Sequence, residues 1–554
     1  MGINIDMNTE INRLPHQSEE GHVHGKQDGQ IKTQIPYDKT DFLFALILPA
    51  LGFLFIKLIV AVLSKSHFGL GVFVFTLCFT ACVWVWSRRE GMGMDRAAAV
   101  NLALVLLLGG FFVVYQNVAL QCIALFLLIA AAAYWVLTVS KCRVENKLGD
   151  FIVFDMFYAL CAIPFGNFGK LCKMIKGGFR KKQGSKGVMS AIVGVLLALP
   201  VCLFVGTLLK DADAAFAYFW QRFALILYPM DFLILFFQIV ISVPVSFYLY
   251  GLIYGAVKRK NQGVVGREEA SEMLVKAKAL PYPMVIGGIT PLLALYLLFF
   301  FSQTAYFLSA FRGILPQDMV YAEYARRGFF ELCAVSMINL CFLAVLVFFT
   351  KGQRSGPEPG KAAKKPISAV VYSCMLTVFS LAMIIISLSK MFLYIHIYGL
   401  TPLRVYTSWF MVFLLAVFLS VFIRIAAPSF NVVKYIVSTA MVMFLLLCYA
   451  DTDRVIAWYN VEGYRSGKLA QLDVPLLGQL GSSATGYLIA VIEDDSMDPA
   501  SKQEAREILR GRLQAYENGD GGSGYSGGDW RNMTLSGYWS GKNLAQYRDT
   551  ILSQ

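Results

Sequence analysis

The residues best able to do chemistry are concentrated in the stretch 321–332, which reads YAEYARRGFFEL. On a helix, Glu323, Arg327 and Glu331 fall four residues apart on one face, so Arg327 can pair with a carboxylate in either direction. Charged groups that enter a lipid-spanning helix are costly unless they pair or serve a site. The stretch therefore predicts an ion-paired row at a membrane boundary. Its other members in the candidate site are Tyr324 and Arg326.

Two further segments carry reactive side chains. KDADAAFAYFWQRF contributes Asp211 and Asp213, either of which can cap a helix that lies flat on the lipid surface. KMFLYIHIYGLTPLRVYTSW contributes His396 and Arg404. Carboxylates and a histidine can support acid–base or metal chemistry, but single residues from three separate segments match no catalytic or metal-binding spacing. We therefore predict a binding surface at these residues, with no catalytic residue, no metal and no cofactor.

The elements that must position these residues are membrane-spanning helices. Hydrophobic residues make up 57% of the 554-residue chain, charged residues only 15%, and the mean hydropathy is +0.59. Runs of about twenty apolar residues, each long enough to cross a hydrocarbon core, recur along most of the chain. We predict an all-α polytopic membrane protein with about eleven transmembrane helices. The predicted spans are 41–63, 68–86, 97–115, 118–139, 188–209, 228–256, 284–308, 329–349, 367–389, 408–427 and 431–450.

The distribution of basic residues predicts the orientation of these spans. The loops that follow even-numbered spans hold 24 lysines and arginines, whereas the loops that follow odd-numbered spans hold 8. Cytoplasmic loops are enriched in such residues. We expect a cytoplasmic N-terminus, an extracytoplasmic C-terminus and the three reactive segments on the outer face of a plasma membrane. The net charge of +13 follows from this loop bias, so no nucleic-acid partner is predicted.

One short apolar segment, residues 151–165, would reverse the predicted side of every later loop if it crossed the membrane as an additional span. It is only fifteen residues long and contains Asp155 and Pro164, so we expect an interfacial or re-entrant helix on the cytoplasmic side. The basic run Lys170–Lys186 follows it without an acidic residue. Such a run suits the anionic headgroups of a lipid bilayer, and we predict anionic lipid as its partner.

A few polar residues lie inside the predicted spans. Lys57 and Asp231 are candidates for a path through the bundle, although Lys57 can also extend its ammonium group to the membrane surface. For the amides, interhelical hydrogen bonding is the favoured interpretation. Those amides are Asn101, Gln121, Gln238 and Asn339. Gly251 and Gly255 form a GxxxG step that suits close helix contact.

The chain divides into three predicted parts. Residues 1–40 are polar and irregular, and we expect a disordered cytoplasmic tail. Because this tail precedes the first apolar run, we expect that run to be an anchor and not a signal peptide. Residues 41–450 form the transmembrane domain, with a basic cytoplasmic loop at 140–187. Residues 451–554 are expected to form a soluble, helical extracytoplasmic domain, which is the predicted site for a protein partner.

Several strings in the sequence resemble a known family. YAEYARRGFFEL, YIHIYGLTPLRVYTSWF and WYNVEGYRSGKLAQLDVPLL are similar to landmarks of bacterial multi-pass membrane proteins of the domain-of-unknown-function type. The resemblance covers roughly residues 200–490. GQLGSSATGYLI stands where the family usually has a leucine–serine turn and an acidic residue. The resemblance implies a membrane architecture and an outer-face motif, but no activity.

Three functions are compatible with these features. The favoured hypothesis is a non-enzymatic envelope component for sensing, signalling or assembly, whose outer segments bind a ligand or partner. A secondary transporter of a small molecule is the first alternative and depends on Lys57 and Asp231. A membrane-embedded enzyme that acts on a lipid-linked substrate is the second, and it depends on the carboxylates and the histidine of the outer face.

Overall fold

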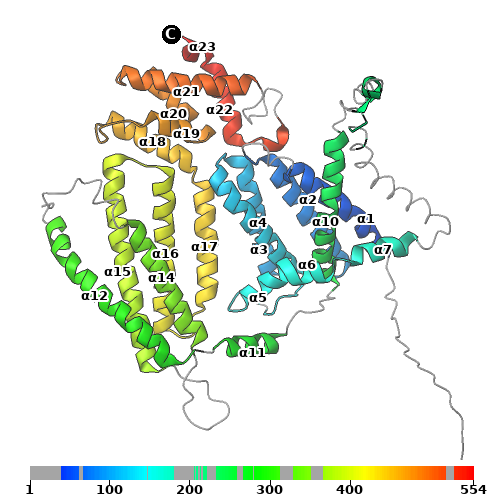
Figure 1. Ribbon diagram of the computed structural model, residues 1–554, viewed down its shortest axis with the longest axis horizontal. Helices are drawn as coiled ribbons and strands as arrows, with labels where there is room; N and C mark the ends of the chain where they lie inside the picture. The colour runs from blue at the N-terminus through cyan, green and yellow to red at the C-terminus, as the bar shows by residue number, and fades with distance from the viewer. Residues whose placement is uncertain are drawn as a thin grey trace, which may run out of the picture.

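Figure 1 shows the computed structural model of the chain. It describes residues 39–60, 67–145, 147–179, 205, 208–209, 212–213, 216–220, 232–258, 266–278, 280–311, 329–350, 366–518 and 529–553. In these ranges the chain is built of helices and contains no strand, apart from one isolated bridge between Leu280 and Thr350. The prediction of an all-α polytopic membrane protein is confirmed.

The long helices form two bundles that stand side by side (Figure 1). The first bundle contains α1 (Lys39–Leu58), α2 (Leu70–Arg89), α3 (Arg96–Val114), α4 (Val118–Val139) and α10 (Phe232–Val257). The second contains α12 (Tyr282–Phe311), α14 (Phe329–Ala344) with the π-helical turn η4 (Val345–Phe349), α15 (Ile367–Tyr398) and α16 (Pro402–Ala426). Helix α17 (Val432–Tyr449) packs against both α16 and α3 and so joins the bundles.

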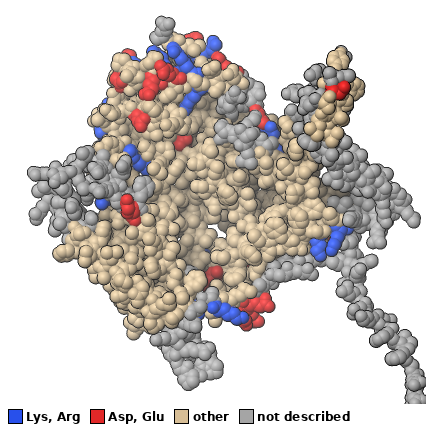
Figure 2. Space-filling view, viewed as in Figure 1, with Lys and Arg blue, Asp and Glu red and all other residues tan. Residues whose placement is uncertain are grey.

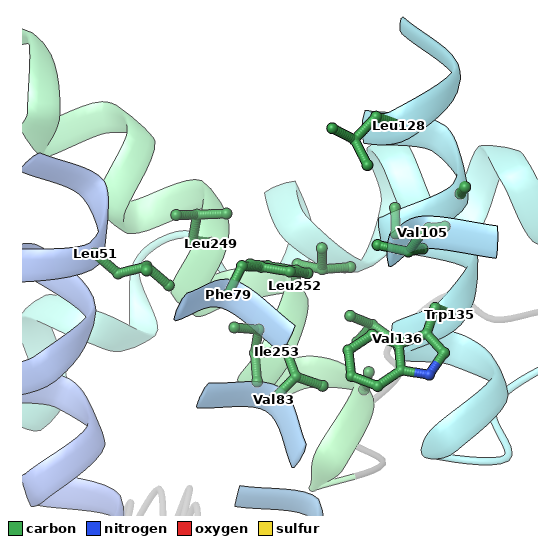
Figure 3. Packing of buried hydrophobic residues seen from close by; sticks show 14 of the residues in the cluster. Leu51, Phe79, Val83, Val105, Leu128, Trp135, Val136, Leu249, Leu252 and Ile253 are labelled. Atoms are coloured by element: carbon green, nitrogen blue, oxygen red, sulfur yellow. The ribbon is translucent and has the colours of Figure 1, made fainter. Parts of the chain in front are cut away.

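Each bundle has its own apolar core. In Figure 3, side chains from α1, α2, α3, α4 and α10 converge in the first bundle, where Leu51 of α1 points toward Leu249 of α10. Trp86 is fully buried and stacks on Phe44 with ring centroids 4.3 Å apart. These contacts bring together helices that are far apart in the sequence, and they fix the ends of the helices relative to one another.

Ten helical segments among the described residues are long and apolar enough to cross a membrane. They include every predicted span except two. The span at 188–209 lies almost wholly outside the described residues, and the span at 329–349 contains only the shorter apolar helix Glu331–Ala344. The remaining candidate is Ile152–Met174, which is not among the predicted spans.

The segment from Ile152 is a broken helix. It consists of α5 (Ile152–Phe157), the π-helical turn η2 (Tyr158–Ala162), α6 (Ile163–Gly166) and α7 (Lys170–Phe179). In Figure 1 these pieces run across the lower ends of the first bundle and not along its helices. Length and composition would allow this segment to span a membrane, so the predicted interfacial or re-entrant helix stays a prediction.

The GxxxG step of α10 makes the close contact that the sequence predicts. A Cβ atom on Gly251 would lie 2.2 Å from the Pro164 carbonyl oxygen, and one on Gly255 would lie 2.4 Å from Asn167 Nδ2. Only glycine leaves room for α6 to cross α10 at this distance. The glycines therefore position the broken helix beneath the first bundle.

The predicted interhelical amide bonds are confirmed for Asn339, Asn101 and Gln238. Gln121 instead bonds the backbone of Phe68 and Tyr115, which lie outside the helices. Asn339 Nδ2 donates to Ser380 Oγ (2.9 Å), and Tyr296 Oη donates to Asn339 Oδ1 (2.5 Å). This chain of bonds joins α12, α14 and α15. In the first bundle, Asn101 Nδ2 of α3 donates to Thr138 Oγ1 of α4 (3.2 Å).

An ion-paired cluster marks the lower end of the first bundle. Lys258 Nζ lies 3.0 Å from Asp41 Oδ1 and 2.5 Å from Glu90 Oε1. At the upper end, Lys57 Nζ donates to Gln238 Oε1 (3.4 Å). Helices α1 and α10 are therefore antiparallel, and α1 begins at the lower end.

The last helices form a layer over the upper ends of both bundles (Figure 1). They are α18 (Thr452–Arg465), α19 (Val474–Gln479), α20 (Thr485–Glu493), α21 (Pro499–Glu517), α22 (Leu535–Gln546) and α23 (Arg548–Leu552), with the short turns η5 (Ser482–Ala484) and η6 (Trp530–Asn532). We call this layer the C-terminal helical region. It has its own buried core, to which Ile456, Leu488 and Leu509 contribute.

Charged side chains are concentrated at the upper and lower sides of the molecule. Figure 2 shows them over the C-terminal helical region and along the lower edge, with a largely uncharged belt between. Apolar side chains are exposed in that belt, for example Phe126 and Leu298. An uncharged belt of this kind is what a bilayer-embedded surface requires. Which edge faces the cytoplasm stays a prediction.

Candidate functional site

The structure places only part of the predicted outer-face cluster. Six of the predicted residues lie outside the described residues: Asp211, Asp231, Glu323, Tyr324, Arg326 and Arg327. The predicted pairing of Arg327 with its two glutamates therefore stays a prediction. The described members are Asp213, Glu331, His396 and Arg404, together with Lys57.

Asp213 is a helix cap, as predicted. Its Oδ1 accepts a hydrogen bond from the Phe216 amide (2.7 Å), and Phe216 stacks on Trp220 one turn later. This short helix stands apart from the C-terminal helical region in Figure 1. Asp213 is thus not brought to the other described members of the cluster.

Glu331 and His396 lie on neighbouring helices. Glu331 is in the first turn of α14, close enough to Lys390 of α15 for an electrostatic interaction. His396 is exposed and lies six residues further along α15, which is about 9 Å along the helix axis. The two side chains therefore sit at different depths along the bundle.

Arg404 holds the turn between α15 and α16. Its Nη1 donates to the carbonyl oxygens of Tyr398 (2.9 Å) and Gly399 (2.5 Å), and its guanidinium lies 4.1 Å from the ring centroid of Tyr394. Gly399 has a φ of +76°, which favours glycine. Arg404 thus has a structural partner for its charge and helps to shape this turn.

Lys57 lies in the last turn of α1, because the helix ends at Leu58 and not at residue 63 as predicted. Its backbone carbonyl accepts a hydrogen bond from Arg531 Nη1 of η6 (2.7 Å). Lys57 is therefore at the upper end of the first bundle, next to the C-terminal helical region. Its predicted role in an intramembrane path stays a prediction.

The structure assembles a different site, centred on the turn Tyr115–Asn117 between α3 and α4. Asn117 is the N-cap of α4, with its Oδ1 accepting from the Leu120 amide (3.1 Å). Its Nδ2 donates to Tyr406 Oη of α16 (2.8 Å) and to Asp453 Oδ1 of α18 (3.0 Å). One side chain thus links the first bundle, the second bundle and the C-terminal helical region. We call residues 115–117 the junction turn.

Gln116 makes the second set of contacts in the junction turn. Its Nε2 lies 2.8 Å from His67 Nδ1, and His67 Nε2 lies 3.2 Å from the Asn532 carbonyl oxygen. Because a carbonyl oxygen only accepts, the contact with Asn532 requires a proton on His67 Nε2. Gln116 Nε2 also lies 2.8 Å from this second ring nitrogen. The buried His67 therefore bridges the junction turn to η6.

A glycine lets the C-terminal helical region approach the junction turn closely. The Gly481 amide donates to Asp453 Oδ2 (2.9 Å), and a Cβ atom on Gly481 would lie 2.5 Å from the Gln116 carbonyl oxygen. The preceding loop is held by Arg512, which donates to the carbonyl oxygens of Leu480 (2.7 Å) and Gly478 (3.0 Å). The fork of a guanidinium suits such a set of acceptors.

A reciprocal amide pair fastens the region to the second bundle. The Leu400 amide donates to Asn460 Oδ1, and Asn460 Nδ2 donates to the Leu400 carbonyl oxygen, both at 2.8 Å. Leu400 lies in the turn that Arg404 shapes. The C-terminal helical region is thus hydrogen-bonded to the upper ends of both bundles.

Burial changes the titration of groups at the junction. Desolvation raises the pKa of Asp453, which is 7% exposed, and the Gly481 amide opposes this shift. Desolvation also raises the pKa of Asp451. Burial lowers the pKa of Arg512, and the charge of Asp453 opposes that shift. The junction therefore contains carboxylates that lose water when the helical region docks.

A pocket of about 600 Å³ opens beside the junction turn. It lies between the end of α3, the start of α18, α20 and α22. Its lining combines two arginines, aromatic rings, hydroxyl groups and apolar side chains. The lining includes Val114, Tyr115, Asp451, Arg454, Tyr487, Leu535 and Trp539. Among the described residues, no group of three or more His, Cys, Asp or Glu side chains could hold a metal ion.

Sequence reasoning did not find this site. Its members come from four distant segments of the chain. Within the site, Asp451 is the N-cap of α18, since its Oδ1 accepts from the Arg454 amide (3.3 Å). A usable signal was the polar pair Gln116 and Asn117 between two strongly apolar spans, at the end predicted to face outward.

The fold and this site define a multi-pass α-helical membrane protein with a helical region fastened to one end of its bundles. The chain belongs to the family of the domain of unknown function DUF4153, whose model matches residues 102–491. The match runs from within α3 to α20, so it includes the junction turn, Asp453 and Arg454. No curated protein and no solved structure matches the chain.

Proposed function

We propose that the protein is a non-enzymatic receptor of the cell envelope that binds a ligand in the junction pocket and transmits its occupancy to both bundles. The supporting observation is the position of the junction turn. Tyr115 lines the pocket, and two residues later Asn117 is bonded to Tyr406 and Asp453. A ligand that displaces Tyr115 acts on a turn to which both bundles are connected.

The chemistry of the pocket favours binding over catalysis. Ser482 Oγ donates to Ser536 Oγ (2.9 Å), and Ser540 Oγ lies 2.7 Å from Thr485 Oγ1. These two contacts pair lining hydroxyls with other hydroxyls and not with a base that could activate a nucleophile. Asp451 is hydrogen-bonded to the lining hydroxyl of Ser483, but its Oδ1 is also occupied as the cap of α18.

The sidedness in this proposal follows from the basic residues of the sequence. The pocket is at the upper ends of the bundles, opposite α7 and α11 (Arg267–Ala277) (Figure 1). The positive-inside rule places the lower side in the cytoplasm, so the pocket faces the outside of the cell.

Anionic lipid is the proposed partner on the lower side. In α7, Leu171 and Met174 are buried in the core of the first bundle, whereas Lys173 is exposed. An amphipathic helix of this kind holds its basic residues at the headgroup level. It would keep the lower end of the first bundle fixed while the upper end responds to the ligand.

Hydrogen exchange of the full chain in nanodiscs tests the proposal. The probe is the polar lipid extract of the producing cells, compared with phosphatidylcholine alone. We expect the extract to slow amide exchange at residues 115–117 and 451–454. Arg454→Gln should abolish this effect, while Arg548→Gln on the exposed pair with Glu517 should not. Unchanged exchange at both segments in the wild-type protein would overturn the proposal.

A further inference from the structure

The junction pocket has a polar end and an apolar end. Arg454, Tyr487 and Asn543 line the polar end, and Val114, Leu535 and Trp539 provide apolar surface. Leu535 and Trp539 are four residues apart on α22, so they lie on one face of the helix. They are 52% and 51% exposed, which is high for large apolar side chains. Such a lining matches a ligand with one polar and one apolar part.

The pocket lies at the boundary of the bilayer. Val114 is the last residue of α3, whose span ends at the same residue, and Tyr115 follows as its C-cap. Tyrosine and tryptophan are the side chains that favour the headgroup level. A molecule in the pocket can therefore keep its apolar part in the lipid beside α3 and place its polar part against α18.

The polar end favours a negative charge. Arg465 forms an ion pair with Asp494 (2.6 Å), which neutralises its charge. Arg454 is exposed and hydrogen-bonded to the phenol group of Tyr487. Asp451 also lines the pocket and interacts electrostatically with Arg454, but its carboxylate is engaged by the Arg454 amide as the cap of α18 and by Ser483. The guanidinium of Arg454 is therefore an exposed cationic group that a negatively charged ligand can contact.

We infer that the ligand of this pocket is an amphiphile with a phosphate-bearing anionic headgroup, bound by Arg454 and Tyr487, with its apolar chain along Leu535 and Trp539. This inference rests on the proposed function, because it names the ligand class of the same pocket. A guanidinium binds phosphate oxygens through two parallel hydrogen bonds, while the apolar end excludes water from that contact. A membrane lipid and a free phosphate ester share the headgroup chemistry, but only the lipid contacts both the polar and the apolar end of the pocket.

Quenching of Trp539 tests the ligand class locally. The delipidated full chain in detergent is titrated with phosphatidylglycerol that carries brominated acyl chains. The difference between wild type and Trp539→Phe isolates the signal of this residue from lipid bound elsewhere, including α7. We expect saturable quenching of Trp539, with an apparent dissociation constant about 10- to 100-fold higher in Arg454→Gln. Arg548→Gln, the matched control, should leave it unchanged.

Two comparisons test whether binding depends on the charge of the headgroup and on the presence of the acyl chain. Brominated phosphatidylcholine should bind more weakly than phosphatidylglycerol, and glycerol phosphate should compete poorly. Equal quenching by both lipids with no effect of Arg454→Gln would overturn the inference, as would competition by glycerol phosphate at the concentrations at which the lipid binds. If the cell extract protects the junction turn while phosphatidylglycerol leaves Trp539 unquenched, the receptor proposal stands and the ligand class is wrong.

Discussion

Replacement of Asn117 by serine isolates the hydrogen bonds that connect the three parts of the molecule. Serine retains the capping of α4, because it is as good an N-cap as asparagine. It removes the Nδ2 donor that reaches Tyr406 Oη at 2.8 Å and Asp453 Oδ1 at 3.0 Å. The change therefore affects the junction and leaves the start of the helix capped.

The expected cost follows from the two lost bonds. A hydrogen bond to a charged group contributes about 1.5–3 kcal/mol, and a neutral one about 0.5–1.5 kcal/mol. Asp453 is buried, so its carboxylate cannot recover the bond from bulk water. The junction should lose about 2–4 kcal/mol in total, which raises the equilibrium constant for local opening by roughly 30- to 700-fold.

Amide hydrogen exchange in detergent measures this opening. Exchange of the α18 amides should accelerate by the same factor in the limit where opening is a fast pre-equilibrium. Asn431→Ser is the matched control, because Asn431 also caps a helix (α17) but is exposed and makes only a 3.4 Å bond to the Leu148 carbonyl oxygen. Equal exchange in the two variants would refute the role of Asn117 as the link.

Three further predictions concern the bundles and the pH dependence. Gly251→Ala should destabilise the detergent-solubilised protein by about 1–3 kcal/mol, because its Cβ would clash with the Pro164 carbonyl. The control Gly287→Ala, which has open space around it, should leave the stability unchanged. Equal melting temperatures of the two variants would contradict the close contact. Lys258→Met should lower the free energy of unfolding by about 3–5 kcal/mol, because it leaves the buried Asp41 without its cation. Lys276→Met, from the exposed pair with Glu272, should lower it by less than about 1 kcal/mol. Similar losses of the two variants in thermal unfolding would count against a buried ion pair. Because the folded-state pKa of Asp453 is raised, its contribution to stability is largest at low pH and is lost as the pH rises through that pKa. Wild type should therefore lose more stability than Asp453→Asn as the pH rises above about 3.9, the pKa of an unperturbed aspartate, and parallel pH profiles would show that this carboxyl is not responsible.

The sequence predicts the membrane helices well because each depends on a local property. About twenty apolar residues in a row satisfy the length of a bilayer wherever they pack, and the glycine step of α10 and the amide of Asn339 carry their signals in a single helix. The boundaries are less predictable. Helix α1 ends at Leu58, several residues before its apolar run ends, and this moves Lys57 to the helix end.

The junction could not be predicted in the same way. Asn117 is separated from Tyr406 by 289 residues and from Asp453 by 336, and no local pattern specifies that these three side chains meet. Arg404 has partners that the sequence does not indicate, since the carbonyl oxygens of the preceding turn accept its hydrogen bonds. Its predicted role in a binding surface stays a prediction. Pairing of a charge depends on tertiary contacts that sequence spacing does not contain.

In our proposal, occupancy of the pocket reaches the second bundle through Asn117. The most direct test compares hydrogen exchange at the start of α16, residues 402–406, in wild type and Asn117→Ser, each with and without the polar lipid extract. We predict that the extract protects residues 451–454 in both proteins but alters α16 only in the wild type. An identical α16 response in the two proteins would contradict the claim.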